Sequence, residues 1–114
     1  MSARSLAAAT RTGAPIFAAL GDETRLRIVA KLSSGGALSI VRLTEGEAMT
    51  RQAITKHLSV LADAGLVRGV RRGRERLWEL ERTPLDTARR YLDLVSRRWD
   101  GALARLAAIV EVDD

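Results

Sequence analysis

Residues 50–64, TRQAITKHLSVLADA, place apolar side chains at the spacing of a helix that is buried along one narrow face. At 100° per residue, Ile54, Leu58 and Leu61 fall within about 60° of one another. Gly65 follows directly, and glycine is the usual left-handed residue just after a helix. The pattern therefore predicts an amphipathic helix over 50–64 that packs on a core through this stripe.

The opposite face of this predicted helix is polar and suited to DNA. Gln can bond adenine through two hydrogen bonds, Lys and Arg reach guanine or phosphate, and Thr and Ser bond either kind of partner. A threonine at position 50 can cap the helix, and the free N–H groups of the first turn can bind a phosphate. An ordinary surface helix shows the same pattern, so this stretch alone leaves both interpretations open. The candidate DNA-binding residues here are Thr50, Arg51, Gln52, Thr55, Lys56 and Ser59.

Residues 66–80, LVRGVRRGRERLWEL, follow the helix at once and mix apolar with basic side chains. Two runs of apolar residues on either side of Gly73 predict two strands, and Gly73 supplies the turn between them. A helix followed by a basic hairpin is the order of a winged helix-turn-helix, in which the wing lies along the DNA backbone or in the minor groove. The candidate DNA-binding residues at the wing tip are Arg71, Arg72, Arg74 and Arg76.

Three segments together resemble the ArsR/SmtB-type winged helix-turn-helix repressors. They are ALGDETRLRIVAKL (residues 19–32), TRQAITKHLSVLADAGLV (residues 50–67) and the wing pattern from Arg71 to Leu80. The resemblance covers roughly residues 14–81 and is closest to the branch of the family without metal-binding cysteines. It implies a DNA-binding repressor that forms a homodimer through its first and last helices. The family often carries a glycine at positions 47 and 48, whereas this chain places its glycine earlier, at Gly46.

The segments before residue 50 predict three further helices. Pro15 suits the first turn of a helix that runs through Leu20, and Asp22 suits the N-cap of a helix over 23–32 with Leu26, Ile28, Val29 and Leu32 as buried positions. A short third helix is expected at about 39–45. Residues 1–13 are small, rich in Ser and Ala and free of acids. We expect a flexible segment there, with at most a short helix over 6–9, rather than a transit peptide.

Residues 84–112 predict a last helix that is longer than a small domain can bury. Pro84 suits its first turn, and apolar residues then recur at spacings of three and four. At 1.5 Å per residue the helix is about 40 Å long. Its surplus apolar face argues for a second chain, because monomers rarely expose large apolar patches. A helix that packs only on its own domain is the alternative. The candidate dimer-interface residues are Leu92, Val95, Trp99, Leu103 and Leu106.

Charge distribution favours DNA over other partners. The chain of 114 residues carries a net charge of +5. Residues 50–76 hold seven basic and two acidic side chains, so the whole excess lies in the predicted helix and wing. The sequence contains no run of 18 apolar residues, so it predicts no membrane span.

Metal binding and catalysis are both disfavoured by composition. The chain contains no cysteine, and His57 is its only histidine. We therefore expect no metal site and no cofactor. His57 is expected to be partly buried and bonded to backbone or phosphate. No nucleophile is paired with a base and an orienting acid, so we expect no enzyme.

Together these patterns predict a mostly α fold with a small β-hairpin wing, in which residues 14–114 form one winged helix-turn-helix domain and residues 84–112 its dimerisation helix. The expected function is that of a cytoplasmic, homodimeric transcriptional repressor that binds an inverted-repeat operator with residues 50–64 and 66–81. A winged-helix module that binds proteins is the alternative function. An effector could be a small molecule or a partner protein, and simple autoregulation needs neither.

Overall fold

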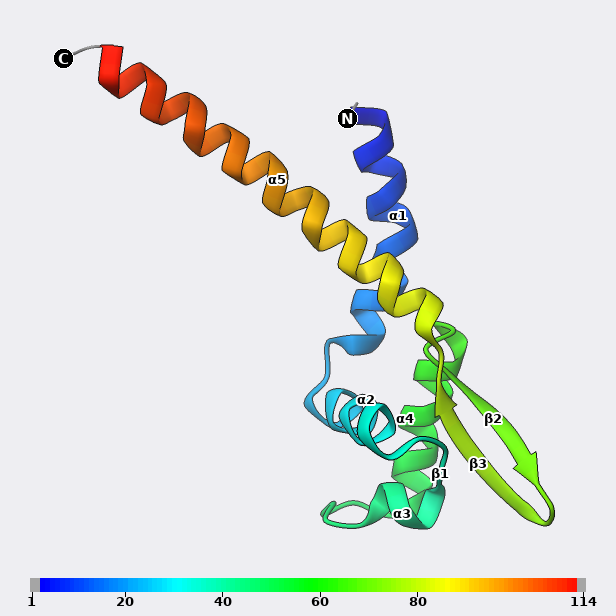
Figure 1. Ribbon diagram of the computed structural model, residues 1–114. Coiled ribbons are helices and arrows are strands. Elements are labelled where there is room, and N and C mark those ends of the chain that lie inside the picture. The colour runs from blue at the N-terminus through cyan, green and yellow to red at the C-terminus, as the bar shows by residue number, and fades with distance from the viewer. Residues whose placement is uncertain (1–2, 113–114) are drawn as a thin grey trace.

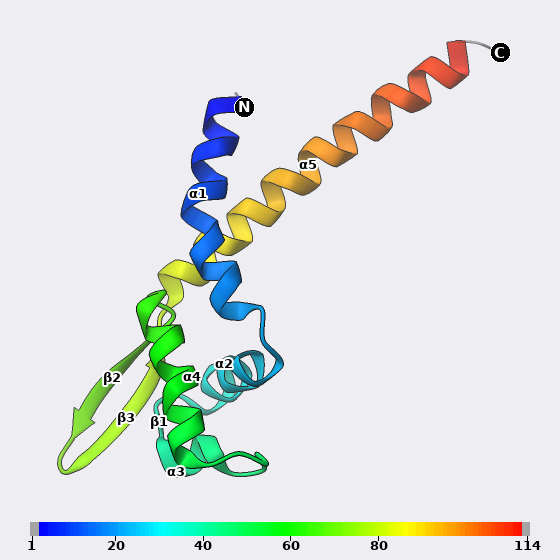
Figure 2. The ribbon, with the colours of Figure 1, turned by 180° about the vertical axis from the view of Figure 1, so that it is seen from behind.

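The structure, a computed structural model that describes residues 3–112, consists of helices around one small sheet. Helices α2, α3 and α4 pack together beside the sheet, and α1 and α5 cross next to this body (Figure 1). Seen from behind, the C-terminal half of α5 again stands clear of the other elements (Figure 2). In chain order the elements are α1 (Ala3–Leu20), α2 (Glu23–Gly35), β1 (Leu38–Ser39), α3 (Ile40–Thr44), α4 (Arg51–Asp63), β2 (Val67–Arg72), β3 (Glu75–Leu80) and α5 (Arg82–Val112).

The apolar stripe of α4 lies at the centre of the core. Ile54, Leu58 and Leu61 are fully buried, which confirms the helical spacing of the sequence. Every other helix and both wing strands contribute to this core. Because the core holds α4 by one narrow face, the opposite face is left to solvent. The remaining members of the buried cluster are Ile16, Ala19, Ile28, Leu32, Leu43, Leu66, Val67, Trp78 and Ala88.

Helix α2 begins at the predicted place. The Asp22 carboxylate accepts the backbone N–H of Arg25 at 3.0 Å and so acts as N-cap. Ile28 and Leu32 are buried as expected, but Leu26, which was also expected in the core, is 50% exposed. Leu26 lies about 160° around the helix from Ile28, so the two side chains cannot face the same core.

The sheet has three strands where the sequence predicts two. The wing strands β2 and β3 pair antiparallel as expected, and β1 pairs with the other edge of β3, Leu38 opposite Trp78 and Ser39 opposite Leu77. Ser39 ends β1 and also caps α3, because its hydroxyl accepts the N–H of Arg42 at 3.3 Å. A strand of two residues is too short to leave a recognisable alternation in the sequence.

Helix α1 extends much further toward the N-terminus than the sequence predicts. Residues 3–13 of the expected flexible segment are helical, and residues 1–2 lie outside the described part. Pro15, expected in the first turn, lies inside the helix, where it removes one backbone hydrogen bond. Packing on α5 offsets this loss, because the rings of Phe17 and Tyr91 meet with centroids 5.6 Å apart. Gly13 is buried beside both rings.

Helix α5 begins two residues before the predicted start, so Pro84 lies in its first turn, where the missing N–H has no helical partner to lose. With 31 residues, the helix is about 46 Å long at 1.5 Å per residue. It gives the molecule principal extents of 70 × 28 × 20 Å. Within residues 3–112, no helix has the length and apolar character that crossing a membrane requires.

Candidate nucleic-acid interface

The outward face of α4 presents the polar side chains expected to contact DNA. Within residues 3–112, Gln52, Lys56 and Ser59 are exposed and bond no other side chain or backbone group, so their polar atoms are available to a ligand. The Thr55 hydroxyl donates to the carbonyl of Arg51 at 2.8 Å and keeps its acceptor capacity.

Thr50 caps α4 as predicted. Its hydroxyl oxygen accepts the backbone N–H of Ala53 at 3.1 Å. The other N–H groups of the first turn have no partner within the helix. The N-terminus of α4 therefore brings free donors and a positive dipole end to the same place as the polar side chains, which suits an anionic ligand.

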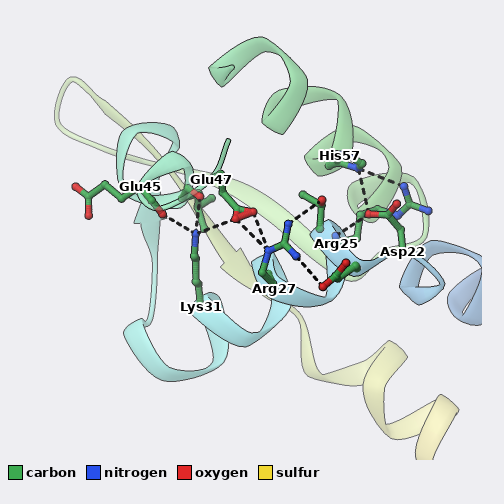
Figure 3. Close-up of polar contacts among 10 residues, drawn as sticks. Asp22, Arg25, Arg27, Lys31, Glu45, Glu47 and His57 are labelled. Atoms are coloured by element: carbon green, nitrogen blue, oxygen red, sulfur yellow. Dashed lines mark hydrogen bonds and ion pairs between the residues drawn. The ribbon is translucent and has the colours of Figure 1, made fainter. Parts of the chain in front are cut away.

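A polar cluster links α4 to α1 and α2. Arg25, in α2, donates through Nε to the Ala19 carbonyl at 2.6 Å. Its Nη1 donates to Nδ1 of His57 at 3.2 Å (Figure 3). Asp22 lies beside them, with Oδ2 3.8 Å from the same His57 nitrogen. The Arg25 backbone N–H and the nearby Arg25 charge hold the pKa of Asp22 below its ordinary value of 3.8. His57 is partly buried as predicted, but its partner is a side chain and not backbone.

A second cluster fixes the turn between α3 and α4. The side chain of Glu47 is only 4% exposed, and its carboxylate accepts two hydrogen bonds from Nε of Arg27, at 2.9 and 3.1 Å (Figure 3). Lys31 donates to the carbonyls of Leu43 and Glu45 at the end of α3, at 3.0 and 2.9 Å. Thus α2 holds both helices of the helix-turn-helix through its cationic side chains.

The sequence pattern did not predict these roles of Arg25, Arg27 and Glu47. One signal was available, since Glu45 and Glu47 in the turn between the two helices favour a cationic partner on the neighbouring helix. The turn itself uses Gly46, whose φ is +79°, in place of the glycine that the family often has at 47 and 48. The earlier glycine therefore provides the left-handed residue that the turn needs.

The junction of α4 with the wing follows the predicted glycine. Gly65 has φ +75°, its N–H bonds the Ala62 carbonyl at 2.9 Å, and the Leu66 N–H bonds the Leu61 carbonyl at 2.9 Å. These two bonds form a Schellman motif, which satisfies the last carbonyls of the helix. The motif sets the direction in which β2 leaves α4, and so sets where the wing lies relative to the helix.

The wing is a hairpin with a two-residue turn at Gly73 and Arg74. Gly73 has φ +64°, as the first residue of a type II′ turn requires. Arg71, Arg72 and Arg74 are exposed near this turn as predicted. Arg76 is also exposed but does not project from the tip, because its guanidinium lies over the ring of Trp78 at 4.8 Å from the centroid. An aromatic face two residues along the same strand attracts it back toward the body.

The exposed apolar residues of α5 form a stripe along the helix. Leu92, Val95, Trp99, Leu103 and Leu106 are all exposed, Trp99 to 64%. Tyr91, by contrast, faces α1 and meets Phe17. The predicted interface residues therefore share one open face of α5 that no described part of the chain covers.

Comparison with known proteins supports the same fold and role. A model of a helix-turn-helix domain matches residues 20–70. YuzN of Bacillus subtilis, an uncharacterised HTH-type transcriptional regulator, is 46% identical over 76 residues, which are 61% of this chain and 83% of YuzN. An ArsR-like transcriptional regulator from Rhodococcus sp. RHA1 superposes with a TM-score of 0.75 and is 36% identical, with 87% of this chain and 92% of that one covered.

A third relative is described as the homodimeric winged helix-turn-helix DNA-binding domain of Mb0332 from Mycobacterium bovis, a possible ArsR-family regulator. It is 26% identical and superposes with a TM-score of 0.61, and the match covers 92% of this chain and 93% of the Mb0332 chain. The polar face of α4, the cationic wing and these matches lead to one conclusion. The chain belongs to the ArsR family of winged helix-turn-helix proteins and is a DNA-binding transcriptional regulator.

Proposed function

We propose that the chain is a homodimeric repressor that occupies an inverted-repeat operator and so blocks polymerase. The observation that carries this proposal is the coincidence of the excess charge with one surface. All of the net charge of +5 lies within residues 50–76, which cover α4 and the wing as far as Arg76. The proposal gives the chain a binding role in the cytoplasm and no catalytic one.

In this proposal, α4 enters the major groove with its N-terminal half foremost. Gln52 and Thr55 contact base edges, where groove-binding helices make their specific contacts. Arg51, Lys56 and Ser59 bind phosphates on either side, and the N-terminus of α4 at Thr50 adds backbone N–H donors to a phosphate. The cationic wing supplies further contacts to the backbone.

A homodimer explains the shape of the chain. The radius of gyration is 19.3 Å, whereas a compact chain of this length has about 13 Å. The excess comes from α5, which extends away from the rest of the chain (Figure 1) and carries an open stripe of apolar residues. A second copy placed by a two-fold axis covers the same stripe on both chains. Two α4 helices related by that axis would face an inverted repeat, and the homodimeric Mb0332 domain is a precedent within the fold.

Selection of bound duplexes from a random pool by the purified protein tests the proposal. We expect an inverted repeat to emerge. Gln52→Ala should then weaken binding to the selected site by about 1–3 kcal/mol. The variant should bind scrambled DNA almost as tightly as the wild type does. Ser59→Ala, at the far end of the same face, is the matched control and should affect both duplexes alike. Failure to select any duplex would favour a protein-binding winged-helix module instead.

A further inference from the structure

The two faces of the wing carry different charges. In an antiparallel hairpin, directly opposed residues share a face, and successive residues alternate between faces. Val67, Gly69 and Arg71 thus lie on one face, opposite Leu80, Trp78 and Arg76. We name this the inner face, because Val67 and Trp78 belong to the buried core and α4 packs against β2. The outer face holds the other six residues, Arg68, Val70, Arg72, Glu75, Leu77 and Glu79.

On the outer face, each arginine is matched by an acid. Nη2 of Arg68 lies 2.6 Å from Oε1 of Glu79, its register partner. Nε of Arg68 lies 2.7 Å from Oε1 of Glu81. The hydrogen bond with Glu79 raises the pKa of Arg68. Arg72 lies directly opposite Glu75, although the two form no ion pair within residues 3–112. The outer face therefore carries as many acids as arginines and has little cationic excess to offer DNA.

On the inner face, the arginines have no acid. Arg71 and Arg76 are directly opposed and exposed, and neither forms an ion pair within residues 3–112. Like charges in opposed positions repel. Contacts within the wing nevertheless hold the Arg76 side chain in place. Its guanidinium lies 4.8 Å from the Trp78 ring centroid, and a side chain at Gly69 would come within 3.3 Å of its Nε.

We propose that Arg71 and Arg76 together bind one phosphate of the DNA backbone, while Arg72 stays outside the interface. The proposal rests on the DNA-binding function proposed above and identifies which wing residues perform it. A phosphate between two guanidiniums turns their repulsion into attraction, and planar guanidinium groups suit its oxygens. The inner face is also the one on the side of α4, so DNA bound along α4 runs beside this pair and not beside Arg72.

Arg71→Ala and Arg72→Ala form a matched pair, because they remove the same charge from neighbouring positions on opposite faces. Each is titrated with salt on a selected duplex and on a scrambled one. Arg71→Ala should weaken binding to both about tenfold, the lower end for a hydrogen bond between charged groups. Arg72→Ala should weaken binding less than about threefold. Equal losses, or a larger loss for Arg72→Ala, would overturn the proposal.

Arg71→Ala combined with Arg76→Ala tests whether the two share a phosphate. Because one phosphate is lost, the slope of log affinity against log salt should flatten by about 0.9. A flattening of about 1.8 would mean two separate phosphates and would overturn the shared site. Arg76→Gln replaces Arg76→Ala if the latter lowers the melting temperature. A wild type that binds no duplex at all refutes the proposed function itself, whereas equal losses in the matched pair refute only this inference.

Discussion

Arg25 donates a hydrogen bond from Nη1 to Nδ1 of His57, 3.2 Å away. A guanidinium has no acceptor, so Nδ1 of His57 must be unprotonated and its proton, in the neutral ring, lies on Nε2. The same arginine donates to the carbonyls of Ala18 and Ala19 at the end of α1. One side chain therefore ties the proposed dimer helix α1 to the proposed DNA-contacting helix α4.

We expect Arg25→Ala to lower the free energy of unfolding by about 1–3 kcal/mol, because it leaves half-buried acceptors on α1 and α4 without a donor. Arg25→Lys should recover part of this loss, since one ammonium cannot reach both helices. Urea denaturation measures the difference. In a double-mutant cycle with His57→Ala, a coupling energy near zero would contradict a direct link between the two residues.

Asp22 makes the fold sensitive to acid. Its pKa in the folded chain lies below 3.8, first because its carboxylate accepts the Arg25 N–H and then because of the Arg25 charge. The stabilisation by the ionised form is therefore complete above the unfolded pKa of 3.8 and is lost as the pH falls through the folded pKa.

Asp22→Asn keeps an N-cap acceptor and removes the titration. Wild type should lose more stability than this variant when the pH falls from about 6 to about 3, a range that spans the carboxyl pKa values. Urea midpoints at both pH values give the comparison. The same drop in both proteins would place the acid sensitivity elsewhere.

The α5 stripe predicts the oligomeric state. Trp99→Ala with Leu103→Ala removes two large side chains, each worth about 1.5–3 kcal/mol when buried, so the variant should sediment as a monomer. Both side chains are exposed in the single chain. Trp99→Phe is the conservative control and should remain a dimer. A wild type that sediments as a monomer at micromolar concentration would rule out the two-fold arrangement.

Metal ions should leave DNA affinity unchanged. The chain has no cysteine and one histidine, and within the described residues no three His, Asp or Glu side chains gather as ligands. Stoichiometric zinc or arsenite, added to the complex with DNA, should not shift the binding curve. Release from DNA that a chelator reverses would reveal a carboxylate site and refute this expectation.

Local patterns were sufficient for the parts of the fold that depend on them. The burial of Ile54, Leu58 and Leu61 follows from helical periodicity, and the caps at Thr50 and Asp22 follow from residue type at a helix start. These features need only a few neighbours along the chain. The wing hairpin belongs with them, because Gly73 marks its turn.

Features that depend on distant partners could not be predicted in the same way. Pro15 suggested a helix start, but α1 begins earlier. The contact of Phe17 with Tyr91, which packs α1 on α5, joins residues far apart in sequence and so leaves no local signal. The buried carboxylate of Glu47 pairs with Arg27, twenty positions earlier, and with Lys31. Arg76 lies near the wing turn in sequence, but the ring of Trp78 draws its guanidinium away from the tip. Side-chain direction and polar pairing are set by tertiary packing.

The free C-terminal half of α5 links folding to protein concentration. In both views it stands apart from the rest of the chain (Figures 1 and 2), and an isolated helix of that length is only marginally stable in water. In the proposed dimer, association stabilises this half by mass action. Amide exchange in residues 100–112 should therefore slow as protein concentration rises, while exchange in α4 stays constant. The far half of α5 would then report how much of the regulator is present.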